Sequence, residues 1–318
     1  MIYFNRYEIE FRKMFLKPED IFNEDDIENA RRSAKPALPH KCPNCSSQNI
    51  NRNGKTRQRK QRYICKSCGK SFSEMTGSPF MYSKKSIEMW IKYLFCMKES
   101  LTLREITRYL GICLTTSFHW RHKILSVVGT QIKGCELSQN IDVHEMKMKE
   151  NFKGNHSKKP VFMDERGSVM ILSSKDSEGN TLVKAPVKNE ITREVLDKVL
   201  VPVIKNGRVL GSPRRQVYIN FARDNNLILN MKGSCTYSVE GMNTGKAQAQ
   251  SLSFKRFLYI FSGVASKYIS YYIILFMITV ESKENIALAL LSKLTRGKQQ
   301  LKVYEFDKVQ FDGMKKVS

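Results

Sequence analysis

Residues 41–70 read KCPNCSSQNI NRNGKTRQRK QRYICKSCGK and hold two Cys-x-x-Cys pairs, Cys42 with Cys45 and Cys65 with Cys68. Four thiolates in this paired spacing can complete a tetrahedron around zinc, as in structural four-cysteine sites. Between the pairs, Asn53-Gly54 predicts a tight hairpin turn, because both residue types tolerate a positive φ. We therefore expect a short β-ribbon that needs one zinc ion to fold. A redox Cys-x-x-Cys is the alternative, and two pairs flanking a hairpin disfavour it.

The predicted ribbon is basic throughout. Residues 41–70 contain no acidic residue, whereas the first 40 residues are near neutral and the whole chain of 318 residues carries a net charge of +24. Such a charge attracts polyanions, and release of the counterions condensed on nucleic acid favours binding. We expect the ribbon to contact DNA through six basic residues: Arg52, Lys55, Arg57, Arg59, Lys60 and Arg62.

Length and composition indicate a folded chain of about two domains of ~150 residues each plus a small module. A hydrophobic content of 41% is enough for a packed core and argues against a disordered chain. The first residues lack a signal-peptide core, and the apolar run 268–280 is shorter than the ~20 residues that span a bilayer. We expect a cytoplasmic, nucleoid-associated protein with no membrane partner. Cys96 and Cys113 are expected to be buried as small hydrophobic residues.

A helical period follows the ribbon. Apolar residues in segment 87–95 recur at three- and four-residue steps. Thr102 and Glu105 form a capping box that predicts a second helix, and Gly111 separates it from a third helix that begins at about residue 115. This layout is that of a helix-turn-helix, although ordinary helical hairpins share it. Its second helix would present these side chains to the major groove: Ser117, His119, Arg121, His122 and Lys123.

From residue 137 the pattern changes to α/β. We expect three antiparallel strands, then a helix, a strand, a helix, a strand and further helices, which is the order of an RNase H-like core. The second and third strands are predicted as a hairpin of residues 161–163 and 168–172. The expected fold is α+β and multidomain: arm and linker 1–40, zinc ribbon 41–80, helix-turn-helix 81–130, RNase H-like mixed-sheet α/β domain 137–280 and tail 281–318.

The chain resembles the zinc-ribbon insertion-sequence transposases of the IS-fifteen-ninety-five group, which have an ISXO-like transposase domain. The resemblance covers about residues 40–280 and includes the Cys42–Cys68 ribbon and the Trp90 helix. Its most specific motifs are Phe152-Lys153-Gly154-Asn155-His156 and the segment FSGVASKY at 261–268. The resemblance implies an RNase H-like nuclease and strand-transfer domain with two divalent metal ions. It also implies double-stranded DNA as partner, at terminal inverted repeats, and action as a homo-oligomer.

The sequence departs from this family at the catalytic positions. The family's first-strand aspartate falls on His144 and its second aspartate on Pro213. The third position falls on Asn243 or Gln248, and the lysine that follows falls on Lys255. Two-metal phosphoryl transfer needs carboxylates that hold the ions ~4 Å apart, and Mg²⁺ prefers such oxygen ligands. One possible substitute shares a strand face with His144, namely Asp142.

The resemblance and these substitutions favour a transposase-family DNA-binding protein of a bacterial insertion sequence (DNA transposition) that is degenerate and catalytically impaired. Zn²⁺ is expected as a structural cofactor, and Mg²⁺ only if the catalytic site works. The alternative is an active transposase that cuts and joins DNA through relocated acidic ligands. A zinc-ribbon module bound to RNA or to a protein assembly is a third class, which leaves the later family motifs unexplained.

Overall fold

The computed structural model describes residues 11, 13–33, 41–56, 61–73, 76, 79–81, 83–131, 135–152, 166–231, 245–282 and 285–296. Most of these residues fall into two compact units. The first holds residues 14–131 and 278–296, and the second holds residues 135–277. None of the described helices is long and apolar enough to cross a membrane.

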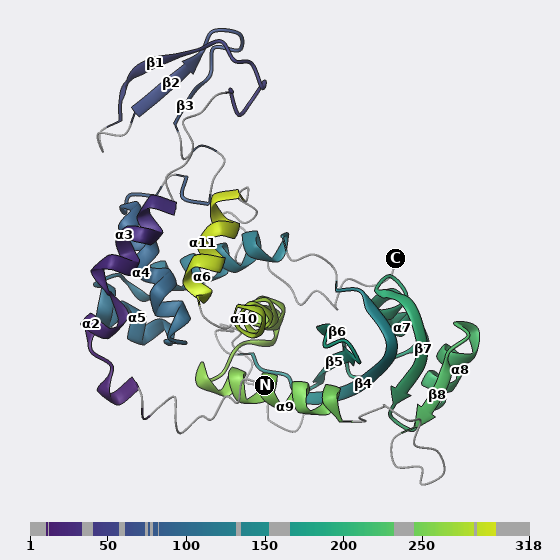
Figure 1. Ribbon diagram of the computed structural model, residues 1–318. Coiled ribbons are helices and arrows are strands. Elements are labelled where there is room, and N and C mark those ends of the chain that lie inside the picture. Colours follow the sequence, from purple (N-terminus) through teal and green to yellow (C-terminus); the bar gives the residue numbers. More distant parts are fainter. Residues whose placement is uncertain are drawn as a thin grey trace. The chain divides into compact units, whose positions relative to one another are not determined.

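The first unit contains a small antiparallel sheet of β1 (Ile50–Lys55), β2 (Gln61–Cys65) and β3 (Ser71–Ser73), with β2 in the centre (Figure 1). The predicted turn at Asn53-Gly54 is wrong, because both residues lie inside β1. The pairing of β1 with β2 shifts between Arg52 and Lys55, and Gly54 has a φ of +62°. A glycine with positive φ suits a β-bulge as well as a hairpin turn, so the dipeptide does not distinguish the two.

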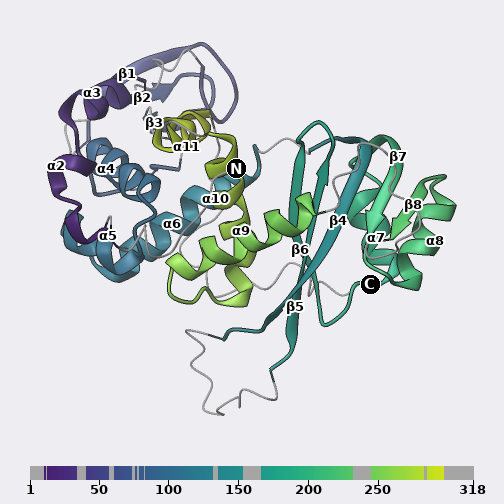
Figure 2. The same cartoon turned by 60° about the horizontal axis from the view of Figure 1, so that its bottom comes forward.

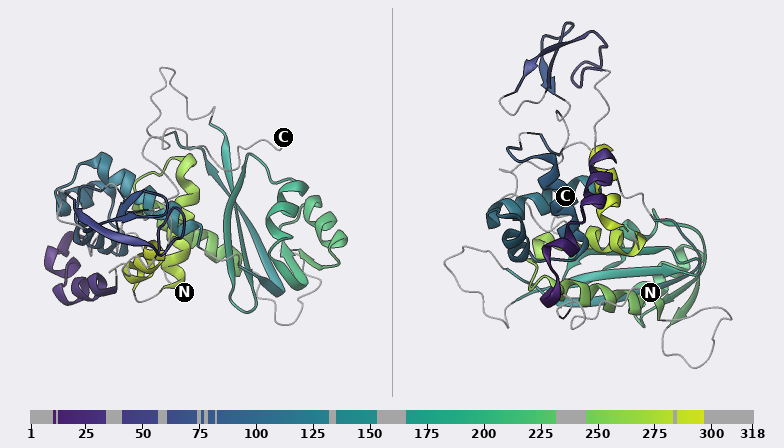
Figure 3. Two further views of the ribbon diagram at one scale, coloured as in Figure 1. Left: turned by 90° about the horizontal axis from the view of Figure 1, so that it is seen from above. Right: turned by 60° about the vertical axis from the view of Figure 1, so that its left-hand side comes forward.

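The same unit contains a set of packed helices, and α4 carries the apolar spacing predicted for segment 87–95. They are α2 (Pro18–Ile21), α3 (Glu24–Ser33), α4 (Ile87–Lys98), α5 (Leu103–Leu110), α6 (Leu114–Gly129) and α11 (Ile286–Arg296). Helix α11 packs against α4 and α6, and α3 packs against α4 and α11 (Figures 1 and 3). The predicted N-terminal arm and C-terminal tail therefore each supply a helix to this unit.

The core of the helical part is aromatic. The rings of Trp90 and Trp120 are stacked at 3.8 Å between centroids, and Tyr93 meets Trp120 edge-on. Cys96 is fully buried here, as expected. The same expectation is wrong for Cys113, which is exposed at the N-cap of α6, where its Sγ lies 3.0 Å from the hydroxyl of Thr116.

The second unit is built on a five-stranded mixed sheet. Its strands are β4 (Leu137–Lys149), β5 (Ser168–Asp176), β6 (Thr181–Lys188), β7 (Ile204–Ser212) and β8 (Ile228–Met231). The spatial order is β6-β5-β4-β7-β8. Strands β4, β5 and β6 pair antiparallel, and β7 pairs parallel with both β4 and β8.

The predicted hairpin of residues 161–163 and 168–172 is wrong in its pairing. Residues 161–163 lie outside the described residues. Segment 168–172 is part of β5, both edges of which are occupied by β4 and β6. The third antiparallel strand is β6, whose Pro186 is compatible with an edge position because an edge strand leaves one row of N–H groups unpaired.

Helices cover the two faces of this sheet differently. Helices α7 (Arg193–Leu200) and α8 (Gln216–Asp224) pack on one face, over a core that includes Ile141 and Leu210. Helix α9 (Lys246–Ile260) packs on β4 and β5 (Figure 2). Helix α10 (Ile269–Glu281) follows it, and the division between the units falls within α10. Residue 142 of β4 faces α9, whereas residue 141 faces α7 and α8.

Candidate functional site

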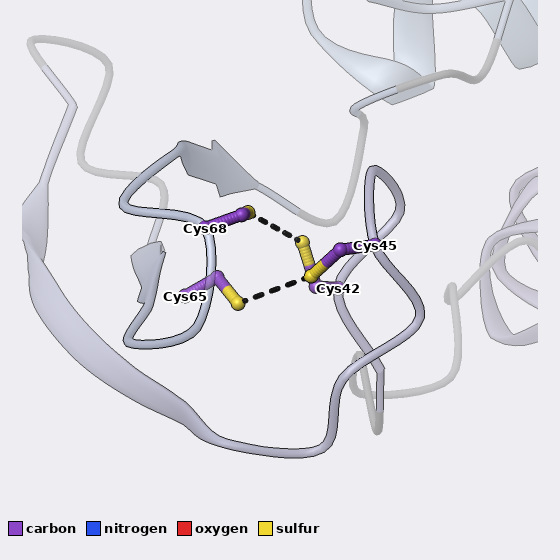
Figure 4. Close-up of side chains that lie close together, drawn as sticks. All are labelled: Cys42, Cys45, Cys65 and Cys68. Carbon is purple, nitrogen blue, oxygen red and sulfur yellow. Dashed lines mark hydrogen bonds between the residues drawn. The ribbon is translucent and has the colours of Figure 1, made fainter.

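The four cysteines of the ribbon converge on one point (Figure 4). Their Sγ atoms all lie within 4.8 Å of one another. The sulfur atoms of Cys42 and Cys68 are 3.7 Å apart, and those of Cys45 and Cys65 are 3.5 Å apart. Zinc–sulfur bonds of about 2.3 Å in a tetrahedron place the sulfurs about 3.8 Å apart, so this donor set fits zinc. The four cysteines form a structural zinc site.

Each Cys-x-x-Cys pair sits in the same type of turn. The N–H of Ser46 donates to the carbonyl of Cys42 at 2.9 Å, and the N–H of Gly69 donates to the carbonyl of Cys65 at 2.8 Å. Ser46 and Gly69 both have a positive φ, of 59° and 68°. Burial opposes ionisation of Cys65, but hydrogen bonds from backbone N–H groups and neighbouring thiols lower its pKa to about 6. A thiolate is the form that binds zinc.

The ribbon has almost no core apart from the metal site. Tyr63 and Phe72 are stacked at 5.7 Å between centroids and pack with Cys42 and Cys65. So small a core cannot offset the conformational entropy that the segment loses on folding. The bound metal therefore supplies most of the stability of the ribbon. The folding of the ribbon is therefore coupled to zinc binding.

The ribbon displays its basic residues on the surface. Arg52, Lys55 and Arg62 are exposed on β1 and β2, and no acidic residue lies in segment 41–70 to neutralise them. Three further predicted contacts lie outside the described residues: Arg57, Arg59 and Lys60. The exposed guanidinium and ammonium groups can bind phosphate oxygens.

Helices α5 and α6 meet through a glycine turn. Thr102 and Glu105 form both hydrogen bonds of the predicted capping box, and Gly111 ends α5 with a φ of +60°. Helix α6 begins at Leu114, slightly before the predicted position. The local pattern therefore identified this pair of helices correctly.

The burial of α6 disagrees with part of the predicted DNA-reading surface. Ser117, Arg121 and His122 are at most 1% exposed. The guanidinium of Arg121 donates to the carbonyl of Leu101 at 2.6 Å, and His122 Nδ1 lies 2.8 Å from the carbonyl of Phe118. These three side chains face the interior, where α6 packs against α5 and the hydroxyl of Tyr93 on α4 lies 3.2 Å from the hydroxyl of Ser117.

Two of the predicted α6 residues remain partly accessible. His119 and Lys123 are half-buried. The Nζ atom of Lys123 lies 6.0 Å from the centre of the Trp90 ring, and burial lowers the pKa of this lysine. Only these two of the five predicted groove residues present side-chain surface to solvent.

In the second unit, Asp142 and His144 face α9. Asp142 is 3% exposed, and its Oδ2 accepts hydrogen bonds from the N–H groups of Gly245 at 3.1 Å and Ala247 at 2.9 Å. His144 Nδ1 lies 2.9 Å from Ser251 Oγ of α9. This partner was missed by sequence reasoning, although Ser251 lies one helical turn before the buried Phe254.

Among the described residues, the other family-equivalent positions bring no second carboxylate to Asp142. Pro213 follows β7 directly, two residues beyond Gly211, which pairs with Asp142. Gln248 is exposed on α9, Lys255 is partly exposed, and Asn243 lies outside the described residues. In the part of the chain that the structure describes, three or more cysteine, histidine or carboxylate side chains come within reach of one metal ion at the cysteine cluster alone. One buried carboxylate, a histidine and a proline do not fit a pair of magnesium ions.

Glu145 points to the opposite face of the sheet and forms a cluster that the sequence did not reveal. Both of its oxygens accept hydrogen bonds from Arg215, at 2.7 and 2.6 Å, and the hydroxyl of Tyr218 donates to it at 2.7 Å. Arg215 also donates to Glu190 at 2.8 Å. Burial and the charge of Glu145 raise the pKa of Tyr218, so its hydroxyl keeps its proton. This cluster holds β4 to the start of α8.

Residues 40–69 match the family described as the InsA N-terminal domain, a zinc ribbon. The matched segment contains all four cysteines of the metal site. The chain is also 22% identical over 120 residues to an uncharacterized protein in transposable element ISH50 of Halobacterium salinarum. That similarity covers 37% of this chain and 40% of the relative's length.

Both comparisons support the resemblance of this chain to zinc-ribbon insertion-sequence transposases. The match to the zinc ribbon agrees with the geometry of the four thiols, which was predicted from their spacing. The spacing identified the ligands because a metal site needs few residues close together in the sequence.

Proposed function

We propose that this chain is a DNA-binding protein derived from an insertion-sequence transposase, and that its catalytic activity is lost or impaired. The observation that carries the proposal is the zinc ribbon, which matches the InsA N-terminal domain and exposes basic residues on its strands. Nucleic-acid phosphates are the anions that such a surface suits best. Duplex DNA is the proposed partner, with the α5–α6 pair as a helix-turn-helix that contacts it through His119 and Lys123.

The architecture of the second unit supports an RNase H-like domain. Its strand order β6-β5-β4-β7-β8, with three antiparallel strands followed by two parallel ones, is the order expected for that fold. Helix α9 also lies against β4, where the family would place its third metal ligand.

The state of Asp142 supports the loss of catalysis. Its Oδ2 already accepts the first N–H groups of α9, and the adjoining family positions are His144 and Pro213. A carboxylate that accepts the first N–H groups of a helix has its negative charge stabilised without a metal ion.

Binding of the full-length, zinc-loaded protein to a duplex would test the DNA proposal. The triple variant Arg52→Ala, Lys55→Ala, Arg62→Ala should flatten the slope of log affinity against log salt by about 2.7, at about 0.9 per phosphate contact. A matched control removes three exposed basic residues of the second unit: Lys198, Lys205 and Arg208. If both triple variants flatten this slope equally, the ribbon makes no specific contact with DNA phosphates.

A nicking and strand-transfer assay with terminal inverted repeats and Mg²⁺ or Mn²⁺ would test the catalytic part. We expect no cleavage above background. Metal-dependent cleavage that disappears in Asp142→Asn, which keeps an oxygen acceptor for α9, would establish instead an active transposase with relocated ligands.

A further inference from the structure

Helix α9 has an outer face that the sheet does not cover. Its inner face is buried and includes Ala247, Ser251, Phe254 and Leu258. The outer face carries residues at i, i+4, i+7, i+8 and i+11, which a helix places in one stripe. The stripe consists of Gln248, Leu252, Lys255, Arg256 and Tyr259, with Leu252 and Tyr259 46% and 50% exposed.

The charge of this stripe is not balanced locally. Residues 241–280 contain four basic residues and no acidic residue. Elsewhere in the same unit, Arg193 and Arg215 form ion pairs with acids at 2.6 to 2.9 Å. Within the described part of the chain, Lys255 and Arg256 form no such pair. The stripe therefore offers its positive charge to a partner.

We propose that this outer face of α9, the α9 stripe, binds the phosphate backbone of duplex DNA. Gln248, Lys255, Arg256 and Tyr259 all carry hydrogen-bond donors of the types that contact phosphate oxygens. Eleven residues of helix span about 16 Å, enough to follow several phosphates. This inference rests on the proposed function and adds to it a second DNA contact, in the unit that lacks the zinc ribbon.

An acidic protein surface is the competing partner for such a stripe. A protein interface, however, usually has a desolvated apolar centre surrounded by a polar rim. In the α9 stripe the apolar Leu252 is a single side chain among donors, and the positive side chains are at the centre. This arrangement fits a repeating phosphate chain better than a protein.

The test uses the full-length, zinc-loaded protein and a duplex, measured over a range of salt concentrations. The double variant Lys255→Ala, Arg256→Ala should flatten the slope of log affinity against log salt by about 1.8, at about 0.9 per phosphate. The double variant Lys198→Ala, Lys205→Ala makes the same charge change on exposed residues of the same unit and should leave the slope unchanged. The charge-conserving double variant Lys255→Arg, Arg256→Lys should keep the wild-type slope.

The outcomes separate this inference from the proposed function. If the ribbon variants lose affinity while the α9 double variant behaves as its control, the α9 stripe does not bind DNA and the proposed function stands. If the α9 variant instead loses affinity for a polyglutamate peptide alone, the partner is an acidic protein and the inference is overturned. If wild-type protein shows no salt-dependent DNA binding, both fail.

Discussion

At the scale of single residues, Asp142 has a structural role at the start of α9. It lies beside the position of a family metal ligand, yet its Oδ2 accepts two N–H groups at the start of α9. The first N–H groups of a helix have no partner within the helix, so a buried acceptor there stabilises the fold.

Removing this acceptor should loosen α9. We expect Asp142→Ala to destabilise the helix start by about 1–2 kcal/mol, and Asp142→Asn, which keeps an oxygen, by less. Hydrogen exchange of the amides in α9 measures this effect. Glu178→Ala, at an exposed position, is the control. Mg²⁺ should leave exchange in α9 unchanged, and protection by Mg²⁺ that Asp142→Asn abolishes would show a metal ligand.

Arg121 has a structural role at the same scale. Its guanidinium is 1% exposed and donates to the carbonyl of Leu101. Arg121→Ala leaves that buried carbonyl without this donor, and we expect a loss of about 1–3 kcal/mol in the free energy of unfolding. Both tryptophans of the chain, Trp90 and Trp120, lie in this helical unit, so urea unfolding followed by tryptophan fluorescence reports on it.

Arg104→Ala on the exposed side of α5 is the matched control, and it should change the free energy of unfolding by less than about 0.5 kcal/mol. Unchanged stability of Arg121→Ala, together with altered sequence preference in DNA binding, would instead support the original prediction that Arg121 reads bases.

Among the elements, the zinc ribbon depends most on a single interaction. Its two cysteine turns repeat the same hydrogen bond and the same positive φ, so each turn presents two thiols toward the other. The strands between them contribute little buried area, because the described core of the ribbon is essentially Tyr63 and Phe72 with the ligands.

Zinc removal should therefore unfold the ribbon and leave the helices of the same unit folded. The apparent binding free energy of a structural zinc site, about 10–16 kcal/mol, exceeds anything this core can supply. Cys45→Ser should lower the zinc content and weaken DNA binding, whereas Cys113→Ser, which changes an exposed cysteine distant from the ligands in sequence, should keep one zinc per chain. Metal analysis of the purified variants decides between these outcomes.

At the scale of the whole molecule, the helical unit is assembled from distant parts of the chain. Helix α11 buries Leu290 and Leu294 completely and packs on α4 and α6, and the side chain of Gln131 donates to the carbonyl of Lys293 at 2.6 Å. The chain thus leaves this unit for the sheet and returns to it, so folding of the helical unit requires its C-terminal segment.

Shortening a buried side chain of α11 should destabilise helices almost 200 residues away in sequence. We expect Leu290→Ala to cost about 2–5 kcal/mol in the unfolding of the helical unit. Ser292→Ala, exposed on the same helix, should be close to neutral. Tryptophan fluorescence during urea unfolding measures both, and equal midpoints for the two variants would mean that α11 does not stabilise this unit.

Much of the zinc site and of the element order was predictable from the sequence. The two Cys-x-x-Cys pairs identified the ligands, Thr102 with Glu105 located the start of α5, and apolar spacing located α4. These signals depend on residues within a few positions of each other, where backbone geometry alone limits what the chain can do.

Other features were decided only by the tertiary structure. The burial of Ser117 and Arg121 involves Tyr93 of α4 and Leu101 just before α5, the partner of His144 lies on α9, and the pairing of β5 depends on which strands reach both of its edges. The sequence by itself determined the metal ligands and the helices, because those follow from local spacing. Only packing between distant segments decided which polar side chains are accessible, because a helical period does not reveal how many neighbours will cover the helix.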